Sequence, residues 1–439
     1  MRAPRTSLKT VVSHVLAGLV CASMLTAAPG CASAPAAKAQ TTGAGREYAF
    51  WPSFPQEPRV QFLRAFSSSE DVSPTENDTF SQLVFGAESK GAQGINKPYG
   101  VTMKNGRIYV CDIRTPCLTV LDIPKKQTRL VGVSGLNRLQ HPVDVAVADD
   151  GMIYVADNKR AVIVVFDKDE KFSTVFGRKD LMPIALAVHG DRLYVCDMTG
   201  HSVEVLDRLT GKTIGVIGKV GDGDGEFRLP LGVATDTKGN VYVVDLMRCR
   251  VQKFSPDGAY LAGVGTTGDY PGAFVRPKHI SVDAAGNLYV VDAAFQNVQM
   301  FDERLQLLLA FGAAGGFPGS MDLPVGVCTS DEGLELFAND LNPGFDAKRL
   351  VIVTNQFGPA KVSVYAVGER RPSYSLQDMA SSAAKVTSGL GSRPDILKLQ
   401  NIGTEEPQAP EGAQGEPPAA PAPGATPPPT PKQPGAPRE

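Results

Sequence analysis

The chain has 439 residues, of which 42% are apolar and 21% are charged, and its formal net charge at pH 7 is −2. A chain of this length can bury a large core. Its near balance of positive and negative charge excludes proteins that bind nucleic acid or acidic membranes through a basic surplus. The two ends differ in composition from the middle, and only the middle is expected to fold into a compact body.

The first 30 residues are predicted to form a signal peptide of the lipoprotein type. Arg2, Arg5 and Lys9 precede an apolar run over residues 11–27, which is the pattern of a secretory signal. Removal of this segment takes away three positive charges and no negative charge, so the formal net charge changes from −2 to −5.

Residues 25–31 (LTAAPGC) resemble a bacterial lipobox, and the resemblance implies that Cys31 is lipidated and becomes the new N-terminus. Ala32 follows this cysteine, which by the sorting rule of such lipoproteins implies the periplasmic face of the outer membrane. Cleavage after Ala37 is the alternative, and it would give a soluble secreted protein. Residues 31–48 are rich in Ala, Gly, Thr and Gln, and we expect them to form a flexible tether.

The C-terminal region has a different composition. Residues 368–402 are predicted to be a weakly structured linker with an amphipathic helix within residues 373–400. Residues 403–439 are rich in Pro, Ala, Gly and Gln and show no apolar period. Such a segment cannot bury enough surface to offset its chain entropy, so we predict a disordered tail.

One six-residue pattern occurs five times in the middle of the chain, with Tyr, Val and a terminal Asp in constant places. The copies are RIYVCD (107–112), MIYVAD (152–157), RLYVCD (192–197), NVYVVD (240–245) and NLYVVD (287–292). The Asp of each copy lies 14 or 15 residues after a proline that opens a short apolar run, and these prolines are Pro98, Pro142, Pro183, Pro230 and Pro277. A fixed internal period of roughly 40 to 50 residues is the signature of a propeller or a solenoid.

Each repeat divides into four short β segments. The proline-led run and the Tyr-Val-x-Asp run are followed by a third segment, such as residues 163–167, and by a fourth that ends in Gly177, Gly218, Gly265 or Gly312. Gly and Asn residues between the segments supply the positive φ of hairpin turns. Four antiparallel strands per period are typical of a propeller blade, because each small sheet can bury its faces only against neighbouring blades.

A sixth unit begins at Pro324 and departs from the pattern. Its second strand fits either residues 335–340, which keep the spacing, or residues 350–355, which form the stronger strand. We favour the second placement and interpret residues 333–348 as an insertion that contains a helical turn.

The ring is predicted to close through an N-terminal strand. Residues 59–66 alternate apolar and polar side chains and have no partner nearby in the sequence, so we expect them to complete the sixth blade, which removes an exposed edge. A short helix is predicted over residues 80–85. The predicted fold class is therefore all-β, a six-bladed β-propeller of four-stranded antiparallel blades over residues 49–367.

The proline-led strand, the Tyr-Val-x-Asp strand and a linker such as residues 221–230 (GDGDGEFRLP) together resemble the NHL-repeat six-bladed β-propellers, and in particular their bacterial lipoprotein members. The resemblance covers residues 50–367. It implies the fold and leaves the function open, because this fold carries binding scaffolds and several kinds of enzyme.

The repeated aspartate could belong to a ring of metal ligands or to the scaffold, and we favour the scaffold. A carboxylate at a strand end accepts hydrogen bonds from turn N–H groups and stabilises the hairpin; the residues are Asp112, Asp157, Asp197, Asp245 and Asp292. Residues 222–225 begin like a calcium loop but lack its later oxygen ligands, so we expect a turn between blades.

Two enzyme classes are known on this fold. The peptide-amidating lyases carry zinc-binding histidines just after the blade proline. None of these places holds a histidine here, so zinc chemistry of this kind is excluded; the residues are Tyr99, Val143, Ile184, Leu231, Lys278 and Val325. A calcium-dependent hydrolase or lyase of the gluconolactonase or paraoxonase kind would need several acids at the central channel. Asp144 alone occupies such a place, so calcium chemistry at the channel mouth stays an alternative.

Five cysteines remain outside the leader and the lipidation site. Cys111 and Cys196 occupy the same place in their repeats and are expected to be small buried core residues. Cys111 and Cys117 are predicted to point to opposite faces of their sheet, so we expect no disulfide between them.

A candidate binding rim is expected on one face, because the start of strand one, the end of strand two and the start of strand three of each blade emerge together. Its residues are Arg114, His141, Asp144, Lys159, Arg160, His201, Arg248, Arg276, Lys278 and His279. No nucleophile, base and orienting residue occur as a set. The predicted function is therefore a monomeric, envelope-anchored scaffold that binds an envelope protein or peptide on this rim, without catalysis, metal or cofactor.

Overall fold

The computed structural model of the protein describes residues 47–73, 93–135 and 137–383. The predicted signal peptide, the lipidation at Cys31, the helix over residues 80–85 and the tail over residues 403–439 lie outside these residues, as do most of the predicted tether and the end of the predicted helix beyond residue 383. Within the described ranges, no helix is long and apolar enough to cross a membrane.

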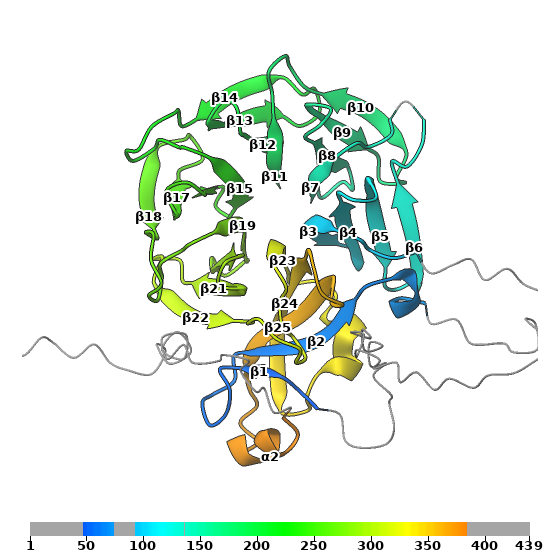
Figure 1. Ribbon diagram of the computed structural model, residues 1–439, viewed down its shortest axis with the longest axis vertical. Coiled ribbons are helices and arrows are strands. Elements are labelled where there is room, and N and C mark those ends of the chain that lie inside the picture. The colour runs from blue at the N-terminus through cyan, green and yellow to red at the C-terminus, as the bar shows by residue number, and fades with distance from the viewer. Residues whose placement is uncertain (1–46, 74–92, 136, 384–439) are drawn as a thin grey trace, which may run out of the picture. The chain divides into compact units, whose positions relative to one another are not determined.

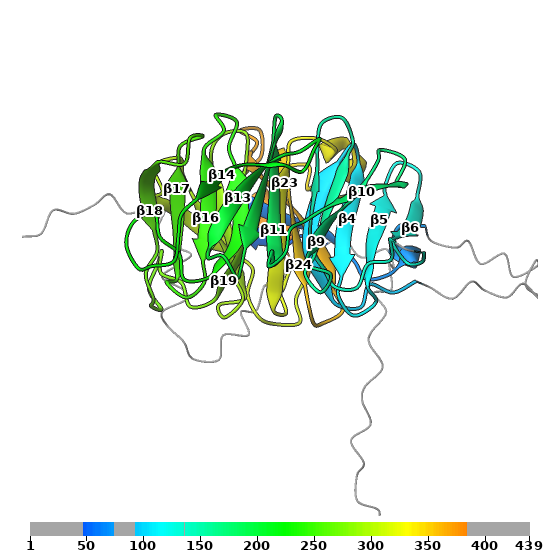
Figure 2. The same ribbon diagram turned by 90° about the horizontal axis from the view of Figure 1, so that it is seen from above.

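The described strands form six antiparallel sheets around a ring, and Figure 1 shows the sheets as blades with one strand of each at the centre. Figure 2 shows the same blades from the side, with their strands running between the two faces of the ring. Blade one contains β3 (Pro98–Lys104), β4 (Arg107–Asp112), β5 (Cys117–Asp122) and β6 (Gln127–Val131), and blade two contains β7 (Pro142–Val147), β8 (Ile153–Asp157), β9 (Val162–Phe166) and β10 (Phe172–Phe176). Blade three contains β11 (Pro183–His189), β12 (Arg192–Asp197), β13 (Ser202–Asp207) and β14 (Thr213–Ile217), and blade four contains β15 (Pro230–Thr235), β16 (Val241–Asp245), β17 (Arg250–Phe254) and β18 (Tyr260–Val264). Blade five contains β19 (Pro277–Val282), β20 (Leu288–Asp292), β21 (Asn297–Phe301) and β22 (Leu307–Phe311). The prediction of a six-bladed β-propeller is confirmed.

Blade six joins the two ends of the described body. Its strands are β23 (Pro324–Ser330), β24 (Phe345–Asn355), β25 (Val362–Arg370) and β2 (Val60–Phe66), with the two-residue β1 (Phe50–Trp51) at its edge. β2 pairs with β25 from Val60 opposite Val367 to Phe66 opposite Val362. The predicted closure by an N-terminal strand is therefore confirmed.

The predicted insertion in blade six is too long. Only the 3₁₀ helix η2 (Leu334–Asp340) and its flanking turns interrupt the blade, because β24 begins at Phe345 and its first residues pair with an extension of β25, Phe345 opposite Arg370. The placement of the second strand over residues 350–355 is correct. Two further short helices are η1 (Ser69–Asp71) and α2 (Leu376–Ser381).

The second strand of each blade is buried on both faces. β4, β8, β12, β16 and β20 show almost no exposed residue, and the tyrosines Tyr154, Tyr194, Tyr242 and Tyr289 are among the largest fully buried side chains. Each of these strands lies between two other strands of its own sheet and between two neighbouring blades. This position explains why the repeated pattern is continuously apolar instead of alternating.

The aspartate that ends each second strand accepts hydrogen bonds from backbone N–H groups on two segments. Asp292 is typical: it accepts from Ala294 and Phe295 in the turn that follows, and from Val275 and Arg276 just before the proline of β19. Equivalent bonds to residues before the blade proline are made by Asp112, Asp157, Asp197 and Asp245. The interpretation of these residues as structural carboxylates is confirmed, and each one also holds the chain that leads into its own blade.

Blade six replaces this aspartate with Asn355. The Asn355 side-chain oxygen accepts from the N–H of Asp322 at 3.3 Å, and its Nδ2 donates to the carbonyl oxygen of Ala360 at 2.8 Å. An amide can both accept and donate, so it serves the longer turn that ends this strand.

Asp245→Ala is expected to lower the free energy of unfolding by about 2–4 kcal/mol, because it leaves the part-buried N–H groups of Arg228 and Leu229 without their acceptor. Asp257→Ala, at an exposed turn of the same blade, should change stability by less than about 0.5 kcal/mol. Urea unfolding followed by circular dichroism measures both. Equal effects of the two substitutions would contradict the structural role of Asp245.

Candidate functional site

The central channel is lined by the inner strands β3, β7, β11, β15, β19 and β23 (Figure 1). In every blade the pairing of the inner strand with its neighbour shifts register just after the blade proline. A β-bulge of this kind re-aims the side chains beside it. The third residues of the six inner strands are Gly100, Asp144, Ala185, Gly232, His279 and Gly326. Only two blades therefore present a polar side chain at this level, and they are the opposite blades two and five.

Asp144 and His279 meet across the channel. His279 Nε2 lies 3.2 Å from Asp144 Oδ2, and His279 Nδ1 lies 3.2 Å from the carbonyl oxygen of Val327 in blade six. The backbone N–H of Leu186 in blade three donates to the same Asp144 oxygen at 2.8 Å. The exposed fractions are 1% for Asp144 and 8% for His279. Both residues are thus buried inside the channel: Asp144 has the channel position considered for the calcium alternative, and neither residue is exposed on the rim.

Glycines on neighbouring blades leave the space that this pair fills. A Cβ added to Gly100 in blade one would lie 2.6 Å from Asp144 Cα and against its side chain, and a Cβ added to Gly232 in blade four would lie 3.1 Å from His279 Cα. The inner strands approach one another so closely at these two points that a larger residue would have to displace backbone.

The surroundings of His279 favour its protonated form. Each ring nitrogen faces an oxygen atom, the Asp144 carboxylate on one side and the Val327 carbonyl on the other, and only the imidazolium can donate to both. Burial opposes this charge, but the Asp144 carboxylate and the Val327 carbonyl outweigh it and raise the pKa of His279. Neither ring nitrogen of His279 is therefore free to take a proton from a substrate in this arrangement, whereas Asp144 Oδ1 is buried and has no hydrogen-bond partner.

The remaining rim residues lie on what we call the upper face, which carries the turns 112–117, 157–162, 197–202, 245–250 and 292–297. Arg114, Lys159, Arg248 and Arg276 are exposed there, and His141, Arg160, His201 and Lys278 are half-buried. Three of them are engaged by neighbours: Arg248 lies 3.4 Å from Asp222, His201 Nδ1 lies 2.6 Å from the Arg228 carbonyl, and Arg160 donates to the Arg138 carbonyl at 3.3 Å.

Arg276 and Lys278 are two cations of this face that stand on either side of Pro277. Neither side chain makes an ion pair with a described acid. Burial lowers the pKa of Lys278, and the nearby Arg276 guanidinium lowers it further. Burial and the Asp144 carboxylate raise the pKa of the nearby Tyr99 phenol, and the Arg276 guanidinium opposes this shift. Two like charges are thus held together at the mouth of the channel.

Two cations of the upper face were missed by sequence reasoning. Lys97 stands directly before Pro98, the place that His141 and Arg276 occupy in their blades, so the repeat could have identified it. Lys361 precedes β25, and its pKa is lowered by burial and by Arg114, against the opposing charges of Asp112 and Asp322. It escaped notice because the sixth unit departs from the pattern.

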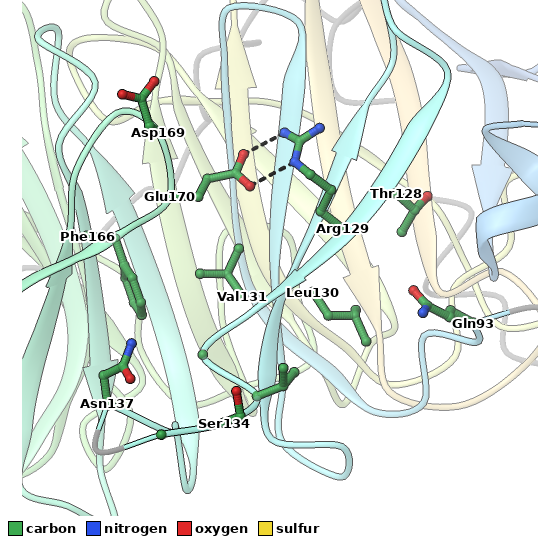
Figure 3. Close-up of a pocket in the computed structure, with 13 residues that line it drawn as sticks. Gln93, Thr128, Arg129, Leu130, Val131, Ser134, Asn137, Phe166, Asp169 and Glu170 are labelled. Atoms are coloured by element: carbon green, nitrogen blue, oxygen red, sulfur yellow. Dashed lines mark hydrogen bonds and ion pairs between the residues drawn. The ribbon is translucent and has the colours of Figure 1, made fainter.

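One cavity of the described body lies away from the channel, between blades one and two. It has a volume of about 790 Å³, and Figure 3 shows Arg129 and Glu170 at one side of it, joined by two hydrogen bonds. These charges satisfy each other, so the cavity offers little to a charged ligand. A second cavity of about 280 Å³ opens beside Lys159, lined by Pro116, Arg138, Leu139 and Gln140.

No family model matches the chain. Among solved structures, the chain is similar to a gluconolactonase from Xanthomonas campestris, with 13% identity and a TM-score of 0.46 over 74% of this chain and 98% of that one. It is also similar to a virginiamycin B lyase from Staphylococcus aureus (10% identity, TM-score 0.44, 62% and 95% covered) and to a calcium-binding protein, regucalcin, from Agrobacterium tumefaciens (11%, 0.42, 63% and 91%). At such low identity the similarity concerns the fold alone.

The channel residues do not suit calcium. Ca²⁺ takes about six to eight oxygen ligands, whereas the charged groups at the centre are one carboxylate, Asp144, and one imidazole, His279, which already bind each other. Across the described residues, no group of three or more His, Cys, Asp or Glu side chains is placed to hold a metal ion. The five described cysteines, Cys111, Cys117, Cys196, Cys249 and Cys328, are free and buried.

Gly100→Ala is expected to destabilise the protein by about 1–3 kcal/mol, because the new methyl group would meet the backbone of Asp144. Gly94→Ala is the matched control, since a Cβ there meets nothing within 4 Å. Thermal unfolding of both variants measures the difference. A Gly100→Ala protein as stable as the control would show that the backbones of Gly100 and Asp144 lie far enough apart to accept a methyl group.

Proposed function

We propose that this chain is a non-catalytic propeller that binds an acidic segment of a protein or peptide on its upper face. The observation that carries the proposal is the pair of unneutralised cations, Arg276 and Lys278, at the channel mouth. A carboxylate bound between them would relieve their mutual repulsion and offset the cost of burying Lys278.

The strand-end aspartates and Asp222 do not compete for that place. The strand-end aspartates are buried and are occupied by backbone N–H groups, as Asp292 is by Val275 and Arg276. Asp222 is held by Arg228, with oxygen–nitrogen distances of 2.8 and 2.6 Å. Uncompensated positive charge therefore remains around the mouth, from Lys97 and Lys159 as well as from Arg276 and Lys278.

Apolar side chains accompany these charges. Met247, Val275 and Phe357 are exposed in loops of the same face, and the Lys97 ammonium lies 5.8 Å from the centre of the Phe357 ring. Exposed apolar and aromatic residues beside arginines are typical of protein-binding surfaces. The cavity beside Lys159 adds a recess for a side chain of the partner.

The Tyr-Val-x-Asp repeat supports the assignment of these blades as NHL-type, and the lipobox-like residues 25–31 support an anchor at Cys31. We propose on these grounds that the propeller is exported and held at the periplasmic face of the outer membrane, where it acts as a monomer. A soluble secreted form is the alternative.

Reversal of both mouth charges, Arg276→Glu with Lys278→Glu, is expected to weaken binding of a fluorescent oligoglutamate peptide at least about tenfold, or ~1.4 kcal/mol. Binding to the unaltered protein should also weaken as salt is added. Fluorescence anisotropy measures both effects.

Lys171→Glu with Lys212→Glu is the control for this experiment. It changes the net charge equally, and both lysines are exposed in turns that connect third and fourth strands, away from the channel mouth. Equal weakening in both double variants, or no binding by the unaltered protein, would contradict the proposed site.

Cys31→Ser is expected to abolish incorporation of labelled palmitate and to move the protein from the membrane fraction to the soluble fraction, because it removes the thiol that would be acylated. Cys21→Ser, within the leader, should leave both properties unchanged. Labelling of the Cys31→Ser protein at the level of the unaltered chain would exclude this anchor.

A further inference from the structure

We propose that Asp144 and His279 form a clasp that joins opposite blades across the channel, and that deprotonation of His279 releases it. The proposal is independent of partner binding on the upper face, and either can fail alone. It rests on the position of the pair, on the hydrogen bonds of the imidazole, and on the groups that surround it.

The pair connects four of the six blades through side-chain contacts. Asp144 belongs to β7 in blade two and accepts from Leu186 of β11 in blade three. His279 belongs to β19 in blade five and donates to Val327 of β23 in blade six. The contact between Asp144 Oδ2 and His279 Nε2 joins the two halves. Blades otherwise touch their immediate neighbours, so this is a connection that the packing of adjacent blades does not supply.

Loss of one proton breaks this arrangement. A neutral imidazole carries one N–H, so either its Nε2 lone pair would face the Asp144 carboxylate or its Nδ1 lone pair would face the Val327 carbonyl. Asp144 is already under-satisfied, because its Oδ1 is buried and has no hydrogen-bond partner. Deprotonation would thus leave a buried carboxylate without its counter-charge, which is strongly unfavourable.

The other ionisable groups around the pair stay neutral while His279 titrates. Burial and the Asp144 charge raise the pKa of Tyr99 on β3, Cys111 on β4, Cys196 on β12 and Cys328 on β23. β11 and β15 bring only backbone and small side chains, such as Gly232. On β19 itself, the neighbouring charges are Lys278 and Arg276, which are both positive. Asp144 is therefore the one described group of opposite charge that faces His279.

The direction of the pH effect follows from the raised pKa of His279. The folded protein holds this proton more tightly than the unfolded chain, whose histidines titrate near about 6.5. The contribution of the clasp is thus fully present below that pH and is lost as the pH rises through the pKa of folded His279. The ring should loosen on the alkaline side.

Two measurements on the complete protein test the clasp. Histidine-selective ¹⁵N NMR should show both nitrogens of His279 protonated on the acidic side of its transition, and this transition should lie at a higher pH than that of a free histidine. Amide exchange of Leu186, corrected for base catalysis, should become at least about tenfold faster once His279 has lost its proton.

His279→Gln and His201→Gln make a matched pair of variants. Glutamine at residue 279 can donate to one acceptor but cannot titrate, so the pH dependence of Leu186 exchange should disappear. His201→Gln, on the upper face, should keep it. A His279 that titrates no higher than a free histidine, a protection of Leu186 that does not change with pH, or the same pH dependence in the His279→Gln protein would each overturn the proposal. The first two outcomes need no variant, so a failure of His279→Gln to fold leaves the test intact.

Discussion

The fold depends on a buried carboxylate at the end of the second strand in five of its six blades. Asp112, Asp157, Asp197, Asp245 and Asp292 each bind backbone N–H groups of the chain that leads into the same blade, and most also bind the turn that follows. A blade of four short strands has little local stability of its own. These bonds hold the start of its first strand against the end of its second, so that the inner strands stand in register around the channel and the residues before each proline emerge together on one face.

The sequence predicted the propeller well because the unit repeats. One short apolar segment could be assigned to a strand or to a helix, but five copies at a fixed spacing make the strand assignment secure. The repeated tyrosines, such as Tyr154 and Tyr242, are buried in the same way in their blades. The prediction was weakest in blade six, where the repeat stops. Residues 345–349 contain three charged side chains and two apolar ones, and they become a strand only because β25 runs far enough to pair with them. That information is non-local, and no window of the sequence contains it.

The candidate site was predicted in part for the same reason. The spacing identified Arg276, Lys278 and their neighbours as residues of one face, but it placed Asp144 and His279 among them. The bulge after each proline turns these two inward, and the glycines at residues 100 and 232 make room for them. A signal was present in the third residues of the inner strands, which are Gly, Asp, Ala, Gly, His and Gly. Two polar residues on opposite blades, among small ones, indicate contact across the channel once the ring is known.

The closure of blade six has a mechanical consequence. The described body begins and ends at one point, where Tyr48 bridges Ala383 and its N–H donates to the Ser382 carbonyl at 3.0 Å. Tension applied to the chain before residue 47 would therefore act first on β1 and β2, the strands that complete the ring, while the five blades built from continuous chain would bear it only afterwards. The N-terminal strands that close the ring are therefore also the strands that mechanical force on the N-terminal side would separate first.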